Sequence, residues 1–96
     1  MKLIAIEKEL PGKTAADFEP HQVLEAKKAW ELYQAGIFRE LYFHKADHTA
    51  IIVLECSGVV EAREVLDSLP LVQQGLITFD ILPLVPYPGF SRLFSR

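Results

Sequence analysis

Hydrophobic and polar residues repeat along this chain with two different periods. Residues 2–10 alternate every second position, which is typical of a β-strand, and Pro11-Gly12 ends the pattern. A polar connection over 13–19 leads to residues 20–35, where apolar residues recur at helical spacing. We predict a helix there, with a buried stripe formed by Val23, Ala26, Ala29, Trp30, Leu32 and Tyr33.

The rest of the chain continues with the same kinds of element. A short turn at 46–48 joins two apolar segments and predicts a β-hairpin, and Pro70 ends the helical pattern that follows. The predicted elements are strands at 37–45, 49–56 and 76–84 and a helix at about 59–69. Strict alternation in the strand at 37–45 puts Ile37, Arg39, Leu41 and Phe43 on one face, and Phe38, Glu40, Tyr42 and His44 on the other.

The order strand, helix, strand, strand, helix, strand indicates two split β-α-β units. We therefore predict a single α+β domain over 1–96, a ferredoxin-like βαββαβ sandwich with a four-stranded antiparallel sheet. Both helices would cover one face of the sheet. The other face carries apolar side chains among its charges, so we expect a second copy to cover it and to form a dimeric α/β barrel. The proline-rich but apolar tail at 86–96 is expected to dock on a partner subunit.

Composition narrows the classes of partner. The net charge of −3 gives no basic face for nucleic acid. The lone Cys56 excludes an internal disulfide and fits a reducing compartment. No apolar stretch approaches the ~18 residues that a membrane span needs, and the N-terminal apolar run is broken early by charge. We expect a cytoplasmic homodimer or higher homo-oligomer that binds neither nucleic acid nor membrane.

Three separated segments resemble the muconolactone isomerase family. Residues 36–42, Gly-Ile-Phe-Arg-Glu-Leu-Tyr, are similar to the stretch that follows the family's first helix. Leu69-Pro70-Leu71 is similar to its Leu-Pro-Leu, and residues 83–88 are similar to the end of its last strand, with Tyr87 where the family has His. The resemblance implies an isomerase that needs no cofactor and shuttles a proton next to a lactone carbonyl, in a pocket between subunits.

The chemistry implied by this resemblance needs a base, an acid and a donor for the enolate. Glu25 flanks the apolar stripe of the first helix and matches a glutamate of the family, so it is the candidate base, with His21 one turn earlier as its partner. The alternative is an ordinary solvated helix edge. Arg39 is the candidate clamp for an oxyanion or carboxylate. Its alternative role is an ion pair with one of the strand acids, Glu7, Glu55 or Asp80, whose orientation the sequence leaves open.

The remaining candidates lie around the predicted hairpin. His44 could act as an acid or base because imidazole titrates near neutral pH, and His48 could contact substrate; both could equally be solvated turn residues. Tyr42 and Phe38 stand where the family has aromatic residues and could line the substrate pocket, or could pack at a sheet or dimer face. The spacing of His, Cys, Asp and Glu does not match a metal-binding pattern, so we expect no metal.

Two functions of different class follow. The first is an isomerase, without cofactor, that acts on a small lactone or other carbonyl acid. The second is a non-catalytic ligand-binding or oligomerisation module of the same fold, which the missing histidine at Tyr87 and the apolar tail would favour. A monooxygenase or haem-degrading protein on the same barrel rests on the fold alone.

Overall fold

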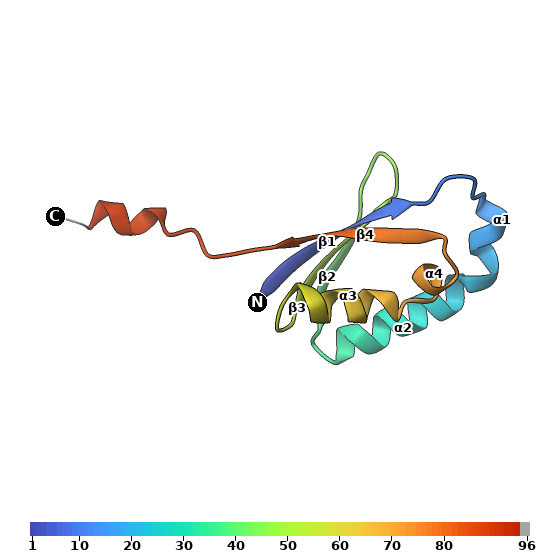
Figure 1. Cartoon of the computed structure of the whole chain (residues 1–96), viewed down its shortest axis with the longest axis horizontal. Coiled ribbons are helices and arrows are strands. Elements are labelled where there is room, and N and C mark those ends of the chain that lie inside the picture. Colours follow the sequence, from blue (N-terminus) through green and yellow to red (C-terminus); the bar gives the residue numbers. More distant parts are fainter. Residues whose placement is uncertain (95–96) are drawn as a thin grey trace.

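The computed structural model describes residues 1–94 and shows a four-stranded sheet with helices on one side (Figure 1). Its strands run antiparallel in the order β2-β3-β1-β4, so the predicted α+β ferredoxin-like fold is confirmed. The elements in chain order are β1 (Lys2–Glu9), α1 (Ala15–Phe18), η1 (Glu19–His21), α2 (Gln22–Gln34), β2 (Phe38–Phe43), β3 (Ala50–Glu55), α3 (Val59–Asp67), α4 (Pro70–Gln73), β4 (Ile77–Pro83) and η2 (Gly89–Leu93).

Two connections contain more structure than the sequence predicts. The polar connection at 13–19 contains α1, because the carboxylate of Asp17 accepts the backbone N–H of Thr14 at 2.8 Å and closes a helical turn. The loop after α3 contains α4, which begins at Pro70, a residue suited to the first turn of a helix. Among residues 1–94, no helix is both long enough and apolar enough to cross a membrane.

The core lies between the helices and the sheet. Its strand residues share one face by register: Leu3 pairs with Leu54, and Ala5 pairs with Ile52. Helices α3 and α4 close the core from the other side with fully or nearly fully buried side chains. The buried residues are Leu3, Ala5, Leu32, Phe38, Ile52, Leu54, Ala62, Leu66, Leu69, Leu71, Leu76, Ile77 and Phe79.

The opposite face of the sheet has no helix over it. Register places alternate residues of all four strands on this open face, and its centre is apolar. The charged residues Lys2, Glu40, Glu55, Lys8 and Asp80 lie on the same face, around that centre. We call the apolar centre the open-face patch; its members are Ile4, Ile6, Tyr42, Ile51, Val53 and Leu82.

The orientation of α2 differs from the sequence prediction. Trp30 is 57% exposed and Val23 is 81% exposed, so the prediction that they are buried is wrong. Trp30 instead stacks on Tyr33 at the surface, with ring centroids 5.7 Å apart. Leu32 is the buried residue of this helix. The helix therefore presents much of its predicted apolar stripe away from the sheet.

A β-bulge changes the faces of β2. Phe38 pairs with Leu54 and the next pair is Glu40 with Val53, so Arg39 is an extra residue in the ladder. Because one residue is added, Phe38 lies on the helix side of the sheet together with Leu41 and Phe43. Strict alternation predicts Phe38 on the opposite face from these two residues. Phe38 is fully buried, and Arg39 is exposed.

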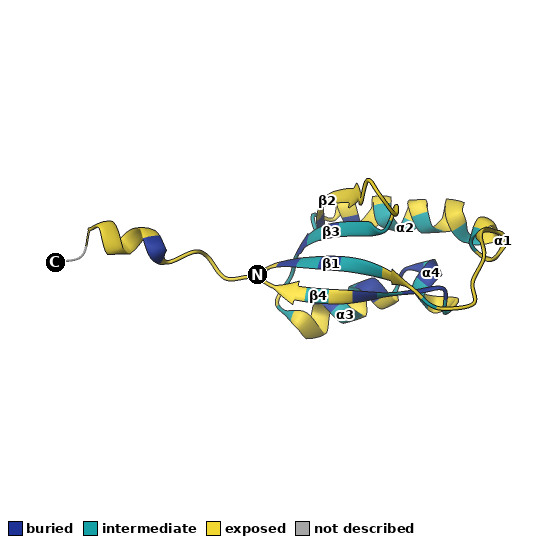
Figure 2. Ribbon diagram, turned by 90° about the horizontal axis from the view of Figure 1, so that it is seen from above, coloured by how far each residue is buried: buried dark blue, intermediate teal, exposed yellow. Residues whose placement is uncertain are grey.

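The tail projects away from the body of the molecule (Figure 1). Leu84 still pairs with β1 through a backbone hydrogen bond to Lys2, and a 3₁₀ helix, η2, forms after the prolines although none is predicted there. Tyr87 and Phe90 contact each other edge to face. The other apolar side chains of the tail are largely exposed (Figure 2), and residues 95–96 of the predicted segment lie outside the described part of the chain.

Candidate functional site

A cavity of about 640 Å³ lies between the sheet and α2, on the side of the sheet that also carries the core. Its walls come from β1, β2, β3, β4, α1, α2, α4 and the connection after β1. The lining combines three carboxylates with apolar and aromatic side chains, namely Glu7, Glu9, Lys13, Thr14, Ala15, Phe18, Gln22, Glu25, Ala26, Ala29, Phe38, Leu41, Tyr42, Phe43, His48, Ala50, Ile52, Leu69, Leu71, Ile77 and Phe79.

The composition of α2 explains why space is left there. The residues of α2 that line the cavity are Gln22, Glu25, Ala26 and Ala29, which recur every three to four positions and are small or polar. Larger apolar side chains at these positions would fill the interior, as Leu32 does further along the helix. The exposed apolar stripe and the cavity are thus two consequences of one helix orientation.

Glu25 is held at the wall of this cavity. Its Oε1 accepts the backbone N–H of Leu71 at 2.9 Å, which fixes a side chain from α2 against the start of α4. Burial raises the pKa of the Glu25 carboxyl above its ordinary value, and the negative charge of Glu7 raises it further, although the Leu71 hydrogen bond opposes both effects. A partly buried carboxylate with a raised pKa is a competent general base near neutral pH.

Glu7 enters the same cavity from β1. Its Oε1 accepts the backbone N–H of Ala50, at the start of β3, at 2.9 Å. Burial is the largest cause that raises the pKa of the Glu7 carboxyl, with smaller contributions from the charges of Glu9 and Asp47. Glu7 therefore lies on the helix side of the sheet. Alternation in the sequence does not show which face of the strand points to this side.

His48 and Phe38 also line the cavity, as the sequence suggests for substrate contacts. His48 has a positive φ of 59°, which is uncommon for a residue other than glycine, and its ring lies edge to face with Phe43 at 6.4 Å. The turn thus directs an imidazole toward the aromatic wall. Lys13 is the lysine of the lining, and no arginine lines the cavity.

Tyr42 borders the cavity, but its hydroxyl is engaged elsewhere. The hydroxyl donates to Glu40 Oε1 at 2.6 Å, and register places both residues on the open face. Tyr42 is 57% exposed. Its hydroxyl therefore does not serve the cavity in this arrangement, and the aromatic ring belongs to the open-face patch.

The structure does not bring three of the predicted site residues to the cavity. His21 precedes α2 and does not line the cavity. His44 lies in the hairpin turn, where its Nδ1 accepts the backbone N–H of Ala46 at 3.1 Å and lies 3.4 Å from Asp47 Oδ1. These contacts, both within the turn, agree with the alternative that His44 is a solvated turn residue. The proposed pairing of His21 with Glu25 is not formed, because Glu25 is bonded to Leu71.

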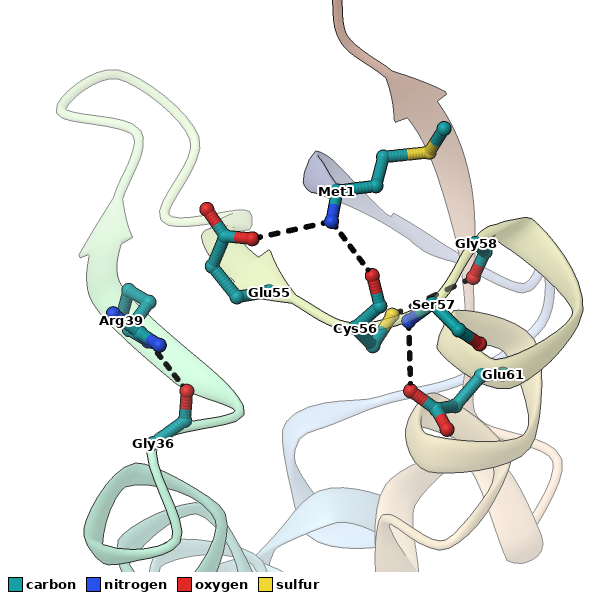
Figure 3. A network of polar contacts seen from close by, with 8 residues as sticks. All are labelled: Met1, Gly36, Arg39, Glu55, Cys56, Ser57, Gly58 and Glu61. Carbon is teal, nitrogen blue, oxygen red and sulfur yellow. Dashed lines mark hydrogen bonds and ion pairs between the residues drawn. The ribbon is translucent and has the colours of Figure 1, made fainter.

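Arg39 is the third of these residues, and its guanidinium bonds to its own chain. Its Nε donates to the carbonyl of Gly36 (Figure 3). The predicted ion pairs with strand acids are also absent among residues 1–94: Glu55 lies 3.4 Å from the amino terminus, and Asp80 pairs with Lys8 at 2.8 Å. Strict alternation predicts that Arg39 shares a face with Leu41, but the β-bulge makes Arg39 an extra residue of the ladder, and Arg39 does not line the cavity.

Five polar residues that line the cavity, Glu7, Glu9, Lys13, Thr14 and Gln22, are not among the predicted site residues. Glu7 belongs to a strand of alternating residues, and the period of two does not show which of the two faces is buried. Lys13 lies in a connection without periodicity. The one usable signal was that Leu3 and Ala5 share a face with Glu7. Within the described chain, no group of three or more His, Cys, Asp or Glu is placed to hold a metal ion.

Comparison with known proteins yields matches of structure only. No protein-family model and no curated protein matches the sequence. The structure of a muconolactone isomerase is similar with a TM-score of 0.75, at 20% identity and with 93% of each chain covered. A 5-chloro-2-hydroxyhydroquinone dehydrochlorinase from Burkholderia phenoliruptrix AC1100, in complex with 2,5-dihydroxybenzoquinone, is similar with a TM-score of 0.68, at 12% identity, covering 93% of this chain and 98% of the other. The chain therefore has the muconolactone isomerase-like fold that its sequence predicts.

Proposed function

We propose that this protein is an isomerase that needs no cofactor and moves a proton within a small lactone or other carbonyl acid, with Glu25 as the base. The observation that carries the proposal is a half-buried glutamate fixed at the wall of a cavity of about 640 Å³. The likeness to a muconolactone isomerase and to a dehydrochlorinase supports small-molecule chemistry in this fold.

The reaction begins with removal of a proton from a carbon next to the carbonyl. Glu25 takes the proton, and the electron pair of the broken C–H bond moves to the carbonyl oxygen to give an enolate. A proton then returns at another carbon of the conjugated system. The raised pKa of Glu25 brings the acid form closer to neutral pH, so the carboxyl can both accept and release a proton.

The enolate oxygen needs a donor, and the lining offers two. His48 and Lys13 both line the cavity and can donate an N–H to an oxyanion. Lys13 also gives a positive charge for a substrate carboxylate, the role that the sequence predicts for Arg39. Phe38, fully buried, forms part of the apolar wall.

A direct test is turnover of β,γ-unsaturated γ-lactones, with and without a carboxylate, by wild type and Glu25→Gln. Glutamine keeps an oxygen to accept the Leu71 N–H but cannot take the proton, so we expect the rate to fall by ~10²–10⁴. Glu64→Gln, at an exposed position of α3, is the matched control and should retain the wild-type rate. Wild-type turnover that Glu25→Gln leaves unchanged would contradict the assignment of the base.

We also propose that the protein works as a homodimer or higher homo-oligomer in the cytoplasm. The open-face patch and the tail side chains Val85, Phe90, Leu93 and Phe94 leave apolar surface uncovered in one chain. A second copy fits the patch, because an antiparallel sheet with a uniform apolar centre can pack against its own copy about a twofold axis. The tail, which projects from the body, would dock on the partner.

The second candidate function is a ligand-binding or oligomerisation module. Arg39 and His44 lie outside the cavity, and this observation favours a site with fewer catalytic groups than the sequence suggests. The same lactone assay separates the two functions. A module would bind a ligand in the cavity, with a saturable change in Trp30 or tyrosine fluorescence, yet would not convert any lactone.

A further inference from the structure

Glu7 and Glu25 come from different elements and meet in one cavity. Glu7 belongs to β1 and Glu25 to α2, and each uses Oε1 to accept a backbone N–H at 2.9 Å. Among residues 1–94, no hydrogen bond holds the other oxygen, Oε2, of either side chain. Each carboxyl is therefore oriented by one oxygen and has a second oxygen free for a ligand or a proton.

The surroundings disfavour two simultaneous negative charges. Glu9 also lines the cavity, and Asp47 lies close enough to influence Glu7. The opposing groups are Lys13, whose amine is one positive charge, and His48. Two half-buried carboxylates in a common cavity repel each other, so the pair holds one proton more readily than either group would alone.

We propose that Glu7 is the second proton-transfer group of this site, so that Glu25 and Glu7 act as a base and an acid on opposite walls. The proposal rests on the proposed isomerase function and deepens it. Glu25 breaks the C–H bond and forms an O–H bond, while the electron pair passes into the enolate. Glu7 then gives its proton to the second carbon, where the enolate's electron pair forms the new C–H bond. Proton transfer from Glu25 to Glu7, directly or through water, restores the starting state.

The geometry favours two groups over one. A single carboxyl that serves both carbons must shift along the substrate between the two steps, but the Leu71 N–H anchors Glu25. Glu7 is anchored in the same way by the Ala50 N–H from β3. Because the groups occupy the α2 wall and the sheet wall, the proton should leave one face of a flat lactone and arrive at the other.

The first test needs no substrate. Carboxyl ¹³C NMR titrations of wild type, Glu7→Gln and Glu64→Gln report the pKa of Glu25 directly. If the two groups are coupled, Glu7→Gln lowers the pKa of Glu25, and Glu64→Gln leaves it unchanged. A Glu25 titration that is the same in Glu7→Gln and wild type would overturn the pair.

The second test uses β,γ-unsaturated γ-lactones in D₂O. We expect deuterium in the product of wild type, because the proton that arrives is not the one that left. Glu7→Gln should still exchange the first C–H with solvent but form product at least ~10²-fold more slowly, whereas Glu25→Gln should lose both reactions. Complete retention of the substrate's own proton, or a wild-type rate in Glu7→Gln, would overturn the relay.

These outcomes separate the relay from the function on which it rests. If no lactone is converted by wild type, the proposed function fails and the relay fails with it, whereas the NMR titration still decides whether the carboxyls are coupled. If wild type and Glu7→Gln convert a lactone equally and Glu25→Gln does not, the proposed function stands and the relay is wrong.

Discussion

Glu7 on β1 and Glu25 on α2 line the same cavity, and each is anchored by a single backbone N–H, from Ala50 and Leu71 respectively. The two residues are 18 positions apart in the sequence, and one belongs to a strand and the other to a helix. Their meeting depends on which face α2 turns toward the sheet.

Stability should depend on pH through these two carboxyls. The pKa of each is raised by folding, so the folded state holds more protons than the unfolded state once the pH rises above the ordinary glutamate pKa. The free energy of unfolding therefore falls as pH rises through that window, and the loss is complete above the raised pKa values. Glu7→Gln and Glu25→Gln should each reduce this loss in urea titrations across the window, because glutamine does not titrate. A pH dependence equal to wild type in both variants would contradict the burial described here.

The positions of Arg39 and His48 predict opposite results for two substitutions. Arg39→Gln should leave lactone turnover within about twofold of wild type, because the guanidinium bonds to Gly36 away from the cavity. His48→Gln should lower turnover by ~10-fold or more, because a cavity donor is altered. His44→Gln, at the exposed other end of the same turn, is the control. A large loss of turnover in Arg39→Gln, together with wild-type turnover in His48→Gln, would show that Arg39 and not His48 donates to the substrate.

The open-face patch should hold two copies together. Val53→Lys and Ile51→Lys place a charge at its centre, and the same charges would face each other across a twofold axis. We expect either variant to raise the dimer dissociation constant at least ~100-fold in sedimentation or light-scattering experiments, with the far-ultraviolet spectrum unchanged. Val60→Lys, on the exposed side of α3, should leave association unchanged. A wild-type protein that is monomeric at micromolar concentration would rule out this use of the patch.

Removal of the tail should affect assembly more than folding. No side chain of residues 85–94 belongs to the buried core, so a chain that ends at Leu84 keeps every core contact. We expect its secondary structure to be retained while its mass in solution falls or its association weakens. Replacing Phe90 and Phe94 by Ser in the full chain tests the same contacts without shortening the backbone. An unchanged assembly in both variants would mean that the tail does not dock on a partner.

The sequence alone determined the order of the elements and hence the fold. Alternation with a period of two, helical spacing and the turn residues Pro11-Gly12 and Pro70 are local signals, and local hydrogen bonding and backbone restrictions convert them into strands and helices. Once the order βαββαβ is given, the handedness and connection rules leave few sheet topologies. The fold could therefore be predicted, and so could the presence of Glu25 on the first long helix.

Only the tertiary structure decided which faces point inward. The sequence predicts that Ala26, Ala29 and Trp30 are buried on one stripe, but packing leaves Trp30 exposed, and the small residues Ala26 and Ala29 line a cavity beside Glu25. The bulge at Arg39 inserts one residue and reverses the faces of β2 around it. Both outcomes depend on how whole elements fit together, since a period identifies the two faces of an element but not which one is buried. For that reason only the folded chain places Glu7 in the cavity and Arg39 outside it.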